Sequence, residues 1–301
     1  MENFVRRFPI SRLALLLLVA WIASACDIVE MYTVAKGPAT EGAMLPGTIT
    51  PTETAKATLT PTLESTFTSS PPPAHLALVG PVFSYKGINF NIDPVLGSQV
   101  FVQDGPDWLG GINFSFAPEG FCREVGCITV YPVGQYRALP WGASLIDKLQ
   151  RAIETQSNDY FPTVGAAILL RARTQHIHFE NGSGIRAVVM RGQDGYYANN
   201  EAIVYDFHGL TDDGRYYVVV EFPIDAPMLL SSYDPEENTN PKAIPAPGIR
   251  RDDPQWASTM IEYNREAARQ LEELDASSFT PALGFLDALV NSVYITPESG
   301  E

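Results

Sequence analysis

The chain has little positive charge, only three cysteines and a low overall content of charged residues. Its 20 Lys and Arg stand against 35 Asp and Glu, which gives a net charge of −15. Because phosphate contacts need Lys and Arg, this balance argues against nucleic acid, or an anionic membrane surface, as a partner held by charge. The same balance is compatible with cationic ligands, with metal ions or with solubility alone.

Several familiar motifs are also missing. The sequence has no Walker loop, no Gly-x-Gly-x-x-Gly fingerprint and no Gly-x-Ser-x-Gly nucleophile elbow. These absences remove the usual sequence signals for nucleotide binding, dinucleotide binding and serine hydrolysis. No cofactor is therefore predicted.

The N-terminus has the three parts of a bacterial export signal. A basic start with three arginines precedes an apolar run at 13–22, which has roughly half the length that a membrane-spanning helix needs. The Ala-Ser-Ala sequence directly before Cys26 resembles the lipobox of bacterial lipoproteins. This resemblance implies that residues 1–25 are a signal peptide and that Cys26 is lipidated. The alternative is an ordinary signal peptide that leaves Cys26 as a free thiol, which is unusual in an oxidising compartment.

Lipoproteins of this kind are anchored in the cell membrane, on its extracytoplasmic side, by acyl chains such as palmitate. The membrane is therefore the first partner that the resemblance implies, and more than one acyl chain makes such an anchor stable. Asp27 directly follows the cysteine. It is similar to the residue that in two-membrane bacteria tends to hold lipoproteins at the inner membrane.

Residues 26–75 are predicted to be a disordered linker between this anchor and a folded domain. The segment is rich in Thr, Pro and Ser and ends in Ser-Ser-Pro-Pro-Pro at 69–73. With few large apolar groups, it cannot bury enough surface to offset the entropy of ordering. As a flexible coil it would span roughly 40 Å, so it is expected to act as a stalk.

Residues 76–301 are predicted to fold as one α+β domain, in which helices flank an antiparallel sheet. Its central element is a hairpin with apolar alternation along 203–207 and again along 216–222. Between these strands, Thr-Asp-Asp-Gly at 211–214 supplies turn chemistry. Because off-phase positions are apolar as well, the hairpin is expected in the middle of the sheet with both faces covered.

Other strands and three helices complete the predicted domain. Apolar alternation between turn residues predicts further strands at 77–81, 88–92, 99–103, 112–116, 128–131, 166–179, 185–190 and 293–295, with a loop at 180–184. Apolar residues three and four apart predict a helix at 144–156 with Ser144 as its N-cap. A second helix is expected to start with Asp253 and Pro254, and a third just after Pro281.

Cys122 and Cys127 are separated by four residues in a chain that is predicted to be exported. This arrangement favours a small disulfide-bonded loop. One alternative is a redox-active pair, although such pairs more often have Cys-x-x-Cys spacing. Another is half of a metal site, which would need further thiol or imidazole ligands.

His176, His178 and Glu180 are candidate metal ligands. Alternate residues of a strand share a face, so both imidazoles and the carboxylate would point the same way, with Ile177 and Phe179 buried behind them. The same pattern occurs on an ordinary solvent-exposed strand face, and no fourth ligand is evident. Both interpretations stay open at this point.

Asp206 and His208 share a face of the central hairpin and could form a carboxylate–imidazole pair for general base catalysis. A nucleophile to accompany them is missing, because Ser183 lies in Asn-Gly-Ser-Gly, a sequence typical of a turn. The loop 234–240 has oxygen ligands at alternate positions. It lacks the central Gly and the final Glu of a calcium loop, so a solvated loop is expected there.

Parts of the domain also resemble known proteins. The segments 184–224, 264–271 and 279–283, and most specifically Gly-Leu-Thr-Asp-Asp-Gly-Arg-Tyr-Tyr-Val at 209–218, look like exported bacterial proteins of no known function. The order of elements is similar to the PsbP-like α/β/α sandwich, which is a likeness of fold and implies no activity.

An anchor and a stalk without catalytic motifs predict a non-catalytic binding or scaffold module that docks a protein or an envelope component. One alternative is a metal- or small-ligand-binding domain that uses the strand face of His176, His178 and Glu180. A hydrolase is the third possibility.

Overall fold

The computed structural model describes residues 76–79, 81–105 and 110–297. All of them belong to one compact unit, Pro71–Glu301. The expected signal peptide, the lipidated Cys26 and the whole of the expected linker lie outside the described residues. Within these ranges, each helix falls short of the length or the apolar character that crossing a membrane requires.

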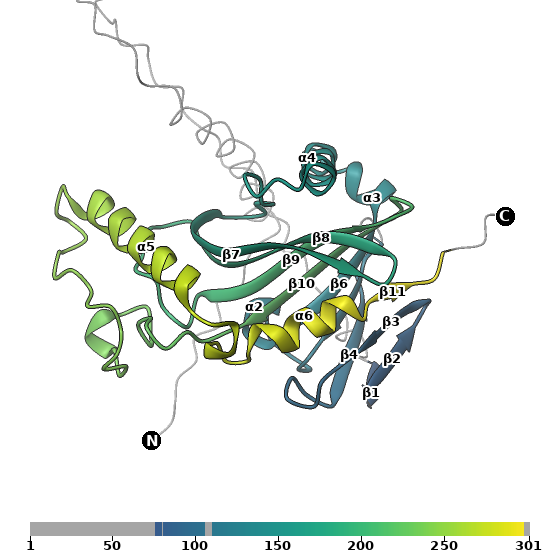
Figure 1. Cartoon of the computed structure of the whole chain (residues 1–301), viewed down its shortest axis with the longest axis horizontal. Coiled ribbons are helices and arrows are strands. Elements are labelled where there is room, and N and C mark those ends of the chain that lie inside the picture. The colour runs from purple at the N-terminus through teal and green to yellow at the C-terminus, as the bar shows by residue number, and fades with distance from the viewer. Residues whose placement is uncertain (1–75, 80, 106–109, 298–301) are drawn as a thin grey trace, which may run out of the picture. The chain divides into compact units, whose positions relative to one another are not determined.

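Two antiparallel sheets form the framework of the described residues (Figure 1). The large sheet has eight strands, which in spatial order are β1 (Leu76–Val79), β4 (Gln99–Asp104), β5 (Ile112–Ser115), β6 (Cys127–Pro132), β10 (Tyr216–Pro223), β9 (Ile203–Thr211), β8 (Gly182–Gly192) and β7 (Ala167–Phe179). The small sheet has the order β11 (Tyr294–Ile295), β3 (Ile88–Asn91) and β2 (Val82–Tyr85). Together with the helices, these sheets confirm the predicted α+β fold class.

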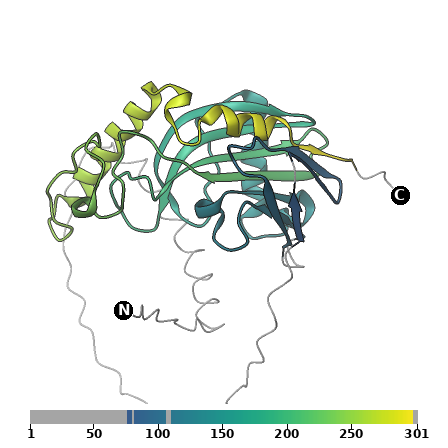
Figure 2. The ribbon, with the colours of Figure 1, turned by 90° about the horizontal axis from the view of Figure 1, so that it is seen from below.

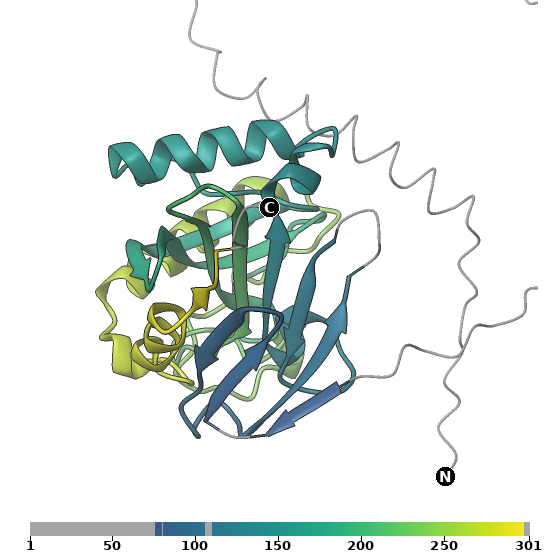
Figure 3. The same ribbon diagram turned by 90° about the vertical axis from the view of Figure 1, so that its right-hand side faces the viewer.

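Helices lie on both sides of the large sheet. Figure 1 shows α3 (Val133–Arg137) and α4 (Gly142–Thr155) on one face, called here the α4 face, and α6 (Leu283–Asn291) on the other, called the α6 face. Helix α5 (Trp256–Glu273) packs against β7, and Figure 2 shows α5 and α6 following one another along the sheet. Figure 3 shows α4 and the small sheet at opposite sides of the domain. The remaining short helix is α2 (Cys122–Val125).

The central hairpin occupies the predicted place. Strands β9 and β10 are the sixth and fifth strands of the large sheet, and all nine residues of β9 are buried. Gly214 in the turn has φ +68°, which a residue without Cβ adopts easily. The Asp213 carboxylate accepts hydrogen bonds from the Thr211 hydroxyl and the Arg215 backbone N–H, so this aspartate has a structural role in the turn.

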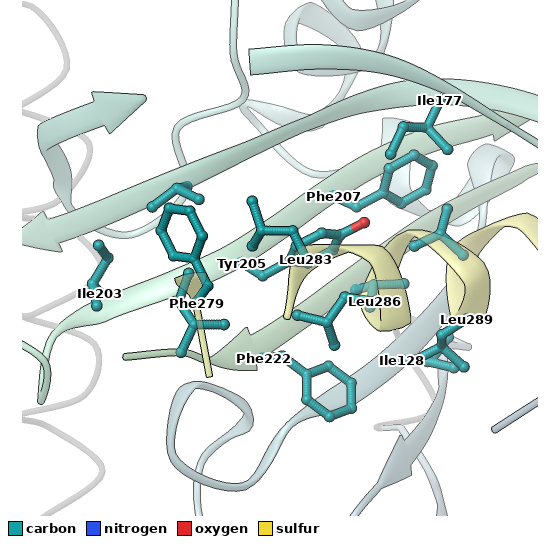
Figure 4. Packing of buried hydrophobic residues seen from close by; sticks show 14 of the residues in the cluster. Ile128, Ile177, Ile203, Tyr205, Phe207, Phe222, Phe279, Leu283, Leu286 and Leu289 are labelled. Atoms are coloured by element: carbon teal, nitrogen blue, oxygen red, sulfur yellow. The ribbon is translucent and has the colours of Figure 1, made fainter. Parts of the chain in front are cut away.

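The main core lies on the α6 face, where the alternate residues of β9 and β10 meet helix α6 (Figure 4). Helix α6 begins just after Pro281, as predicted, and presents the expected apolar residues to the sheet. The labelled side chains in Figure 4 come from β6, β7, β9, β10 and the C-terminal segment, and they are Ile128, Ile177, Ile203, Tyr205, Phe207, Phe222, Phe279, Leu283, Leu286 and Leu289.

The predicted loop at 180–184 is shorter than expected, because only 180 and 181 form the turn and β8 already begins at Gly182. Gly182 and Gly184 are needed for close packing within the sheet. A Cβ on Gly182 would lie 2.1 Å from the Phe179 ring, and one on Gly184 would lie 2.3 Å from the carbonyl oxygen of His208. Ser183 is therefore a strand residue, paired with His178, and does not lie in a turn.

The predicted helix starts are also wrong by two residues. Helix α4 begins at Gly142, without a side-chain cap, and Asp147 pairs with Arg137 of the preceding helix at 2.7 Å. Helix α5 begins at Trp256. The Asp253 carboxylate caps a turn just before it by accepting from the backbone N–H of Gln255 at 2.8 Å. The strand β2 and the helices α2 and α3 were not predicted at all.

A charged group is buried on the α6 face. The side chain of Arg186 is 2% exposed, and its guanidinium binds both carboxylate oxygens of Asp287 on α6, at 3.1 and 3.0 Å. Gln175 Oε1 at 2.9 Å and the backbone carbonyl of Arg173 accept its other N–H groups. The Tyr205 hydroxyl donates to Asp287 at 3.0 Å. These contacts tie α6 to three strands of the sheet.

Candidate functional site

A cleft of about 940 Å³ lies on the α4 face of the large sheet. Its floor is formed by side chains of four adjacent strands, and its walls by helices α2 and α3 and by loop residues. The floor residues are Cys127, Thr129 and Tyr131 of β6, Tyr217, Val219 and Glu221 of β10, Asp206 and His208 of β9, and Arg191 of β8. The walls include Cys122, Arg123, Tyr136, 164–166, 193–196, Tyr233 and Arg251.

Strand register brings the polar floor residues together. Glu221 of β10 stands directly opposite Asp206 of β9 on one side and Cys127 of β6 on the other. Val219, two residues earlier, stands opposite His208 and Thr129 in the same way. Since alternate residues of a strand share a face, these side chains form two adjacent rows across the floor. The two carboxylates are cross-strand neighbours.

Asp206 is a buried carboxylate with two basic neighbours. Its side chain is 1% exposed; the Arg191 guanidinium contacts Oδ2, and Nε2 of His208 lies 3.1 Å from Oδ1. Burial by itself raises the pKa of Asp206, but Arg191 and His208 outweigh burial and lower the pKa to about 2. Desolvation likewise opposes the charge on Arg191, while Asp206 raises the pKa of this arginine above its usual value. The pair is therefore fully ionised at neutral pH.

Tyr217 extends this group of contacts. Its hydroxyl lies 2.5 Å from Nδ1 of His208. The Asp206 carboxylate beside Nε2 favours the histidine tautomer that is protonated on Nε2. Nδ1 therefore accepts a hydrogen bond from the Tyr217 hydroxyl. Burial raises the pKa of Tyr217 well above its usual value, so the phenol stays protonated. The Phe161 ring packs edge-on against the imidazole, with ring centroids 5.2 Å apart.

Glu221 differs from these residues because its carboxylate makes no hydrogen bond or ion pair within the described part of the chain. Burial, and then the negative charge of Asp206, raise the pKa of Glu221 to about 7, although Arg191 and Arg123 act in the opposite direction. A second unsatisfied group lies nearby, since Nε of Arg191 is buried without a hydrogen-bond partner among the same residues. The floor therefore offers one free acid group, whereas the Nε–H of Arg191 is enclosed by protein atoms.

A disulfide bond forms the rim of the cleft beside Glu221. Cys122 of α2 and Cys127 of β6 are joined, which confirms the predicted pair. Both cysteines line the cleft, so the bond connects its wall to its floor.

Replacing both cysteines with serine should lower the free energy of unfolding by about 2 kcal/mol. The bond closes a short loop, with a sequence separation of 5, and the unfolded chain regains that lost freedom when the link is removed. Denaturant titration of the parent and of the Cys122→Ser/Cys127→Ser variant measures the difference. Equal midpoints and equal slopes for both proteins would contradict this expectation.

The predicted metal ligands lie elsewhere, at the edge of the large sheet: the two histidines are on β7 and Glu180 is in the turn that follows it. The expected alternation is present, because Ile177 and Phe179 are buried while His178 and Glu180 are exposed and His176 is half-buried. Among the residues that the structure describes, no three His, Cys, Asp or Glu side chains are grouped closely enough to hold a metal ion. The geometry thus gives the metal prediction no support.

The other candidate sites also lack the arrangement that their predicted chemistry requires. The predicted pair of Asp206 and His208 is brought together, but Ser183 does not line the same cleft. In the loop 234–240, the side-chain oxygens of Asp234 and Asn238 accept backbone N–H groups of their own loop. They are thus already used in local turns.

Glu221, Arg191 and Tyr217 were not identified from the sequence as site residues. A signal for Glu221 was present: it is the one charged residue in the apolar run 216–222, in a strand predicted to be covered on both faces. A carboxylate at such a position needs either a partner or a cavity. Arg191 carried no comparable signal, because it lies at the end of a strand.

Comparisons with protein-family models, with curated proteins and with solved structures find no match to this chain.

Proposed function

We propose that this chain is an exported lipoprotein whose folded domain binds a small molecule in the cleft on the α4 face. The N-terminal sequence supports the first part: a basic start and an apolar run precede Cys26, which would carry the lipid. The linker would then hold the domain on the extracytoplasmic side of the membrane. Helices on both faces of the sheet support the finer likeness to a PsbP-like sandwich, which carries no activity with it.

One observation carries the binding proposal. The cleft has the volume of a small-molecule site, and its floor combines a fixed ionic network with a carboxylate that no described residue binds. Leaving the half-buried Glu221 carboxylate without a partner is unfavourable, so a ligand that satisfies it would gain affinity. Perturbed ionisable groups in a concave site are typical of functional sites.

Small-molecule binding fits this geometry better than the other two functions. A protein-docking surface would be expected to be broad and exposed, whereas the free polar groups here are at the bottom of a cleft. Hydrolysis would need a nucleophile beside the imidazole, and Tyr217, which occupies that position, is fully buried and protonated. Docking of a protein partner by another surface remains a prediction from the sequence.

Native mass spectrometry of the full-length chain, extracted in detergent from an oxidising compartment, tests the proposal. The protein is mixed with a library of small polar metabolites that includes amines, carboxylates and sugars. We expect adducts on the parent and none on Val219→Trp, in which an indole fills the floor of the cleft. Val82→Trp is the matched control, because Val82 lies on β2 and is 69% exposed.

Adducts of equal abundance on Val219→Trp would place binding outside the cleft. A complete lack of adducts on the parent would also contradict the proposal. In either case the docking prediction would become the leading one.

A further inference from the structure

We propose that the ligand of the cleft is a small amine, whose ammonium group binds the Glu221 carboxylate beside the tyrosine rings of the cleft. This inference rests on the proposed function and adds the chemical class of the ligand. It is carried by the charges on the floor and by the aromatic walls.

One negative group on the floor is not balanced by a positive one. Arg191 and Asp206 are in direct contact and neutralise each other. Glu221 stands opposite Asp206 and has no ion partner among the described residues. A half-buried carboxylate next to another carboxylate is stabilised by a cation that the ligand brings, and a charged hydrogen bond is stronger than a neutral one. An anionic ligand would instead meet two carboxylates.

Tyrosine rings line the cleft near this carboxylate. The charge of Glu221 adds to the effect of burial in raising the pKa of Tyr131, so the two groups are electrostatic neighbours. Two further lining residues are Tyr196 and Tyr233, whose rings meet edge to face with centroids 5.1 Å apart. The faces of aromatic rings attract cations, and ammonium ligands are held in this way beside carboxylates. These walls favour an organic cation.

A metal ion fits the cleft less well. Within the described residues no group of three metal-ligating side chains exists, and Asp206 already has both oxygens in contact with basic side chains. An ammonium needs only one carboxylate and can donate its other protons to water or to tyrosine oxygens. A small organic cation with a single ammonium group therefore fits the floor better than a metal ion does.

The charged groups on the rim do not reverse this preference. Arg251 is exposed and paired with Asp194 at 3.1 Å. Arg123 is exposed on α2, and its charge lowers the pKa of Glu221 only in part. The chain as a whole carries −15, so its long-range field attracts cations.

Three matched pairs of probes test the inference on the full-length chain. 4-Amino-1-butanol is compared with 1,4-butanediol, glucosamine with glucose, and choline with 3,3-dimethyl-1-butanol, by isothermal titration at pH 8. Within at least one pair, we expect the amine to bind about tenfold more tightly than its neutral counterpart, or better. Glu221→Gln should abolish this preference. Glu180→Gln, at an exposed position in the turn after β7, should keep it.

Binding of the primary amine should also weaken as the pH falls. The groups that face Glu221 are Asp206 on β9, Arg191 on β8, Tyr131 on β6 and Arg123 on α2, and together with burial they place its pKa near 7. Glu221 is therefore mostly protonated at pH 6, while an alkyl ammonium stays charged at both pH values. We expect about tenfold weaker binding of 4-amino-1-butanol at pH 6 than at pH 8.

The outcomes separate this inference from the proposed function. If Val219→Trp blocks the binding of metabolites that show no amine preference, the cleft is a binding site and the amine inference is wrong. An amine preference that survives in Glu221→Gln also overturns it. If nothing binds to the parent, both proposals fail together.

Discussion

Replacing Asp287 with alanine should lower the free energy of unfolding by about 3–5 kcal/mol, which is a large part of the stability of an ordinary domain. The reason is the position of Arg186, whose side chain is 2% exposed and whose guanidinium binds both oxygens of Asp287. Without this carboxylate, a positive charge stays buried with no counterion. The Tyr205 hydroxyl loses its acceptor as well.

Urea titration of the folded chain measures this effect, and two comparisons assign it. A variant that replaces both partners, Arg186→Met/Asp287→Leu, should recover most of the lost stability, because apolar side chains can fill the same space without an unpaired charge. Glu266→Gln removes one carboxylate of an exposed ion pair on α5 and should cause a much smaller change. A single variant no less stable than the parent would show that the ion pair does not hold α6 to the sheet.

Replacing Glu221 with glutamine should make the protein more stable at pH 8, by about 3 kcal/mol. The pKa of Glu221 is raised from 4.5 to about 7 by burial and by Asp206. The folded state therefore holds this proton more strongly than the unfolded state. Its contribution to stability is fully present below about pH 4.5 and is lost as the pH rises through 7. Glutamine cannot ionise, so the variant avoids the loss.

The pH profile of unfolding separates this effect from a general change in packing. Between pH 5 and pH 8 the parent should lose stability relative to Glu221→Gln, whereas at pH 5 the two proteins should be similar. Glu180→Gln, at an exposed site, should follow the parent throughout. Parallel profiles for parent and Glu221→Gln would contradict a raised pKa. A variant that is more stable but binds no ligand would be a stability–function trade-off.

Most of the fold could be predicted because its strands have regular patterns. Alternation at 203–207 and 216–222 predicted β9 and β10, and the apolar off-phase residues Val204 and Val219 indicated their central place. The errors arose where tertiary contacts determine the local structure. Gly182 and Gly184 indicate a loop by their chemistry, yet they lie in a strand, where Phe179 and His208 leave no room for a Cβ.

The site was predictable only within one strand. Asp206 and His208 are two residues apart, so their shared face followed from the period of a strand. Their partners come from other strands, and register alone puts Glu221 opposite Asp206. Register depends on how whole strands pair, which a single sequence pattern does not fix. The cleft could therefore be identified only from the three-dimensional structure.

The pairing of β11 with β3 determines when the core of the domain can close during synthesis. Tyr294 and Ile295 lie beside Asn89 and Ile88, so the small sheet joins segments about two hundred positions apart. Val293 and Leu289, from the same end, are part of the main core. The core therefore cannot close until the last part of the domain has been synthesised. The chain stays open until then, which is the state that the proposed export requires.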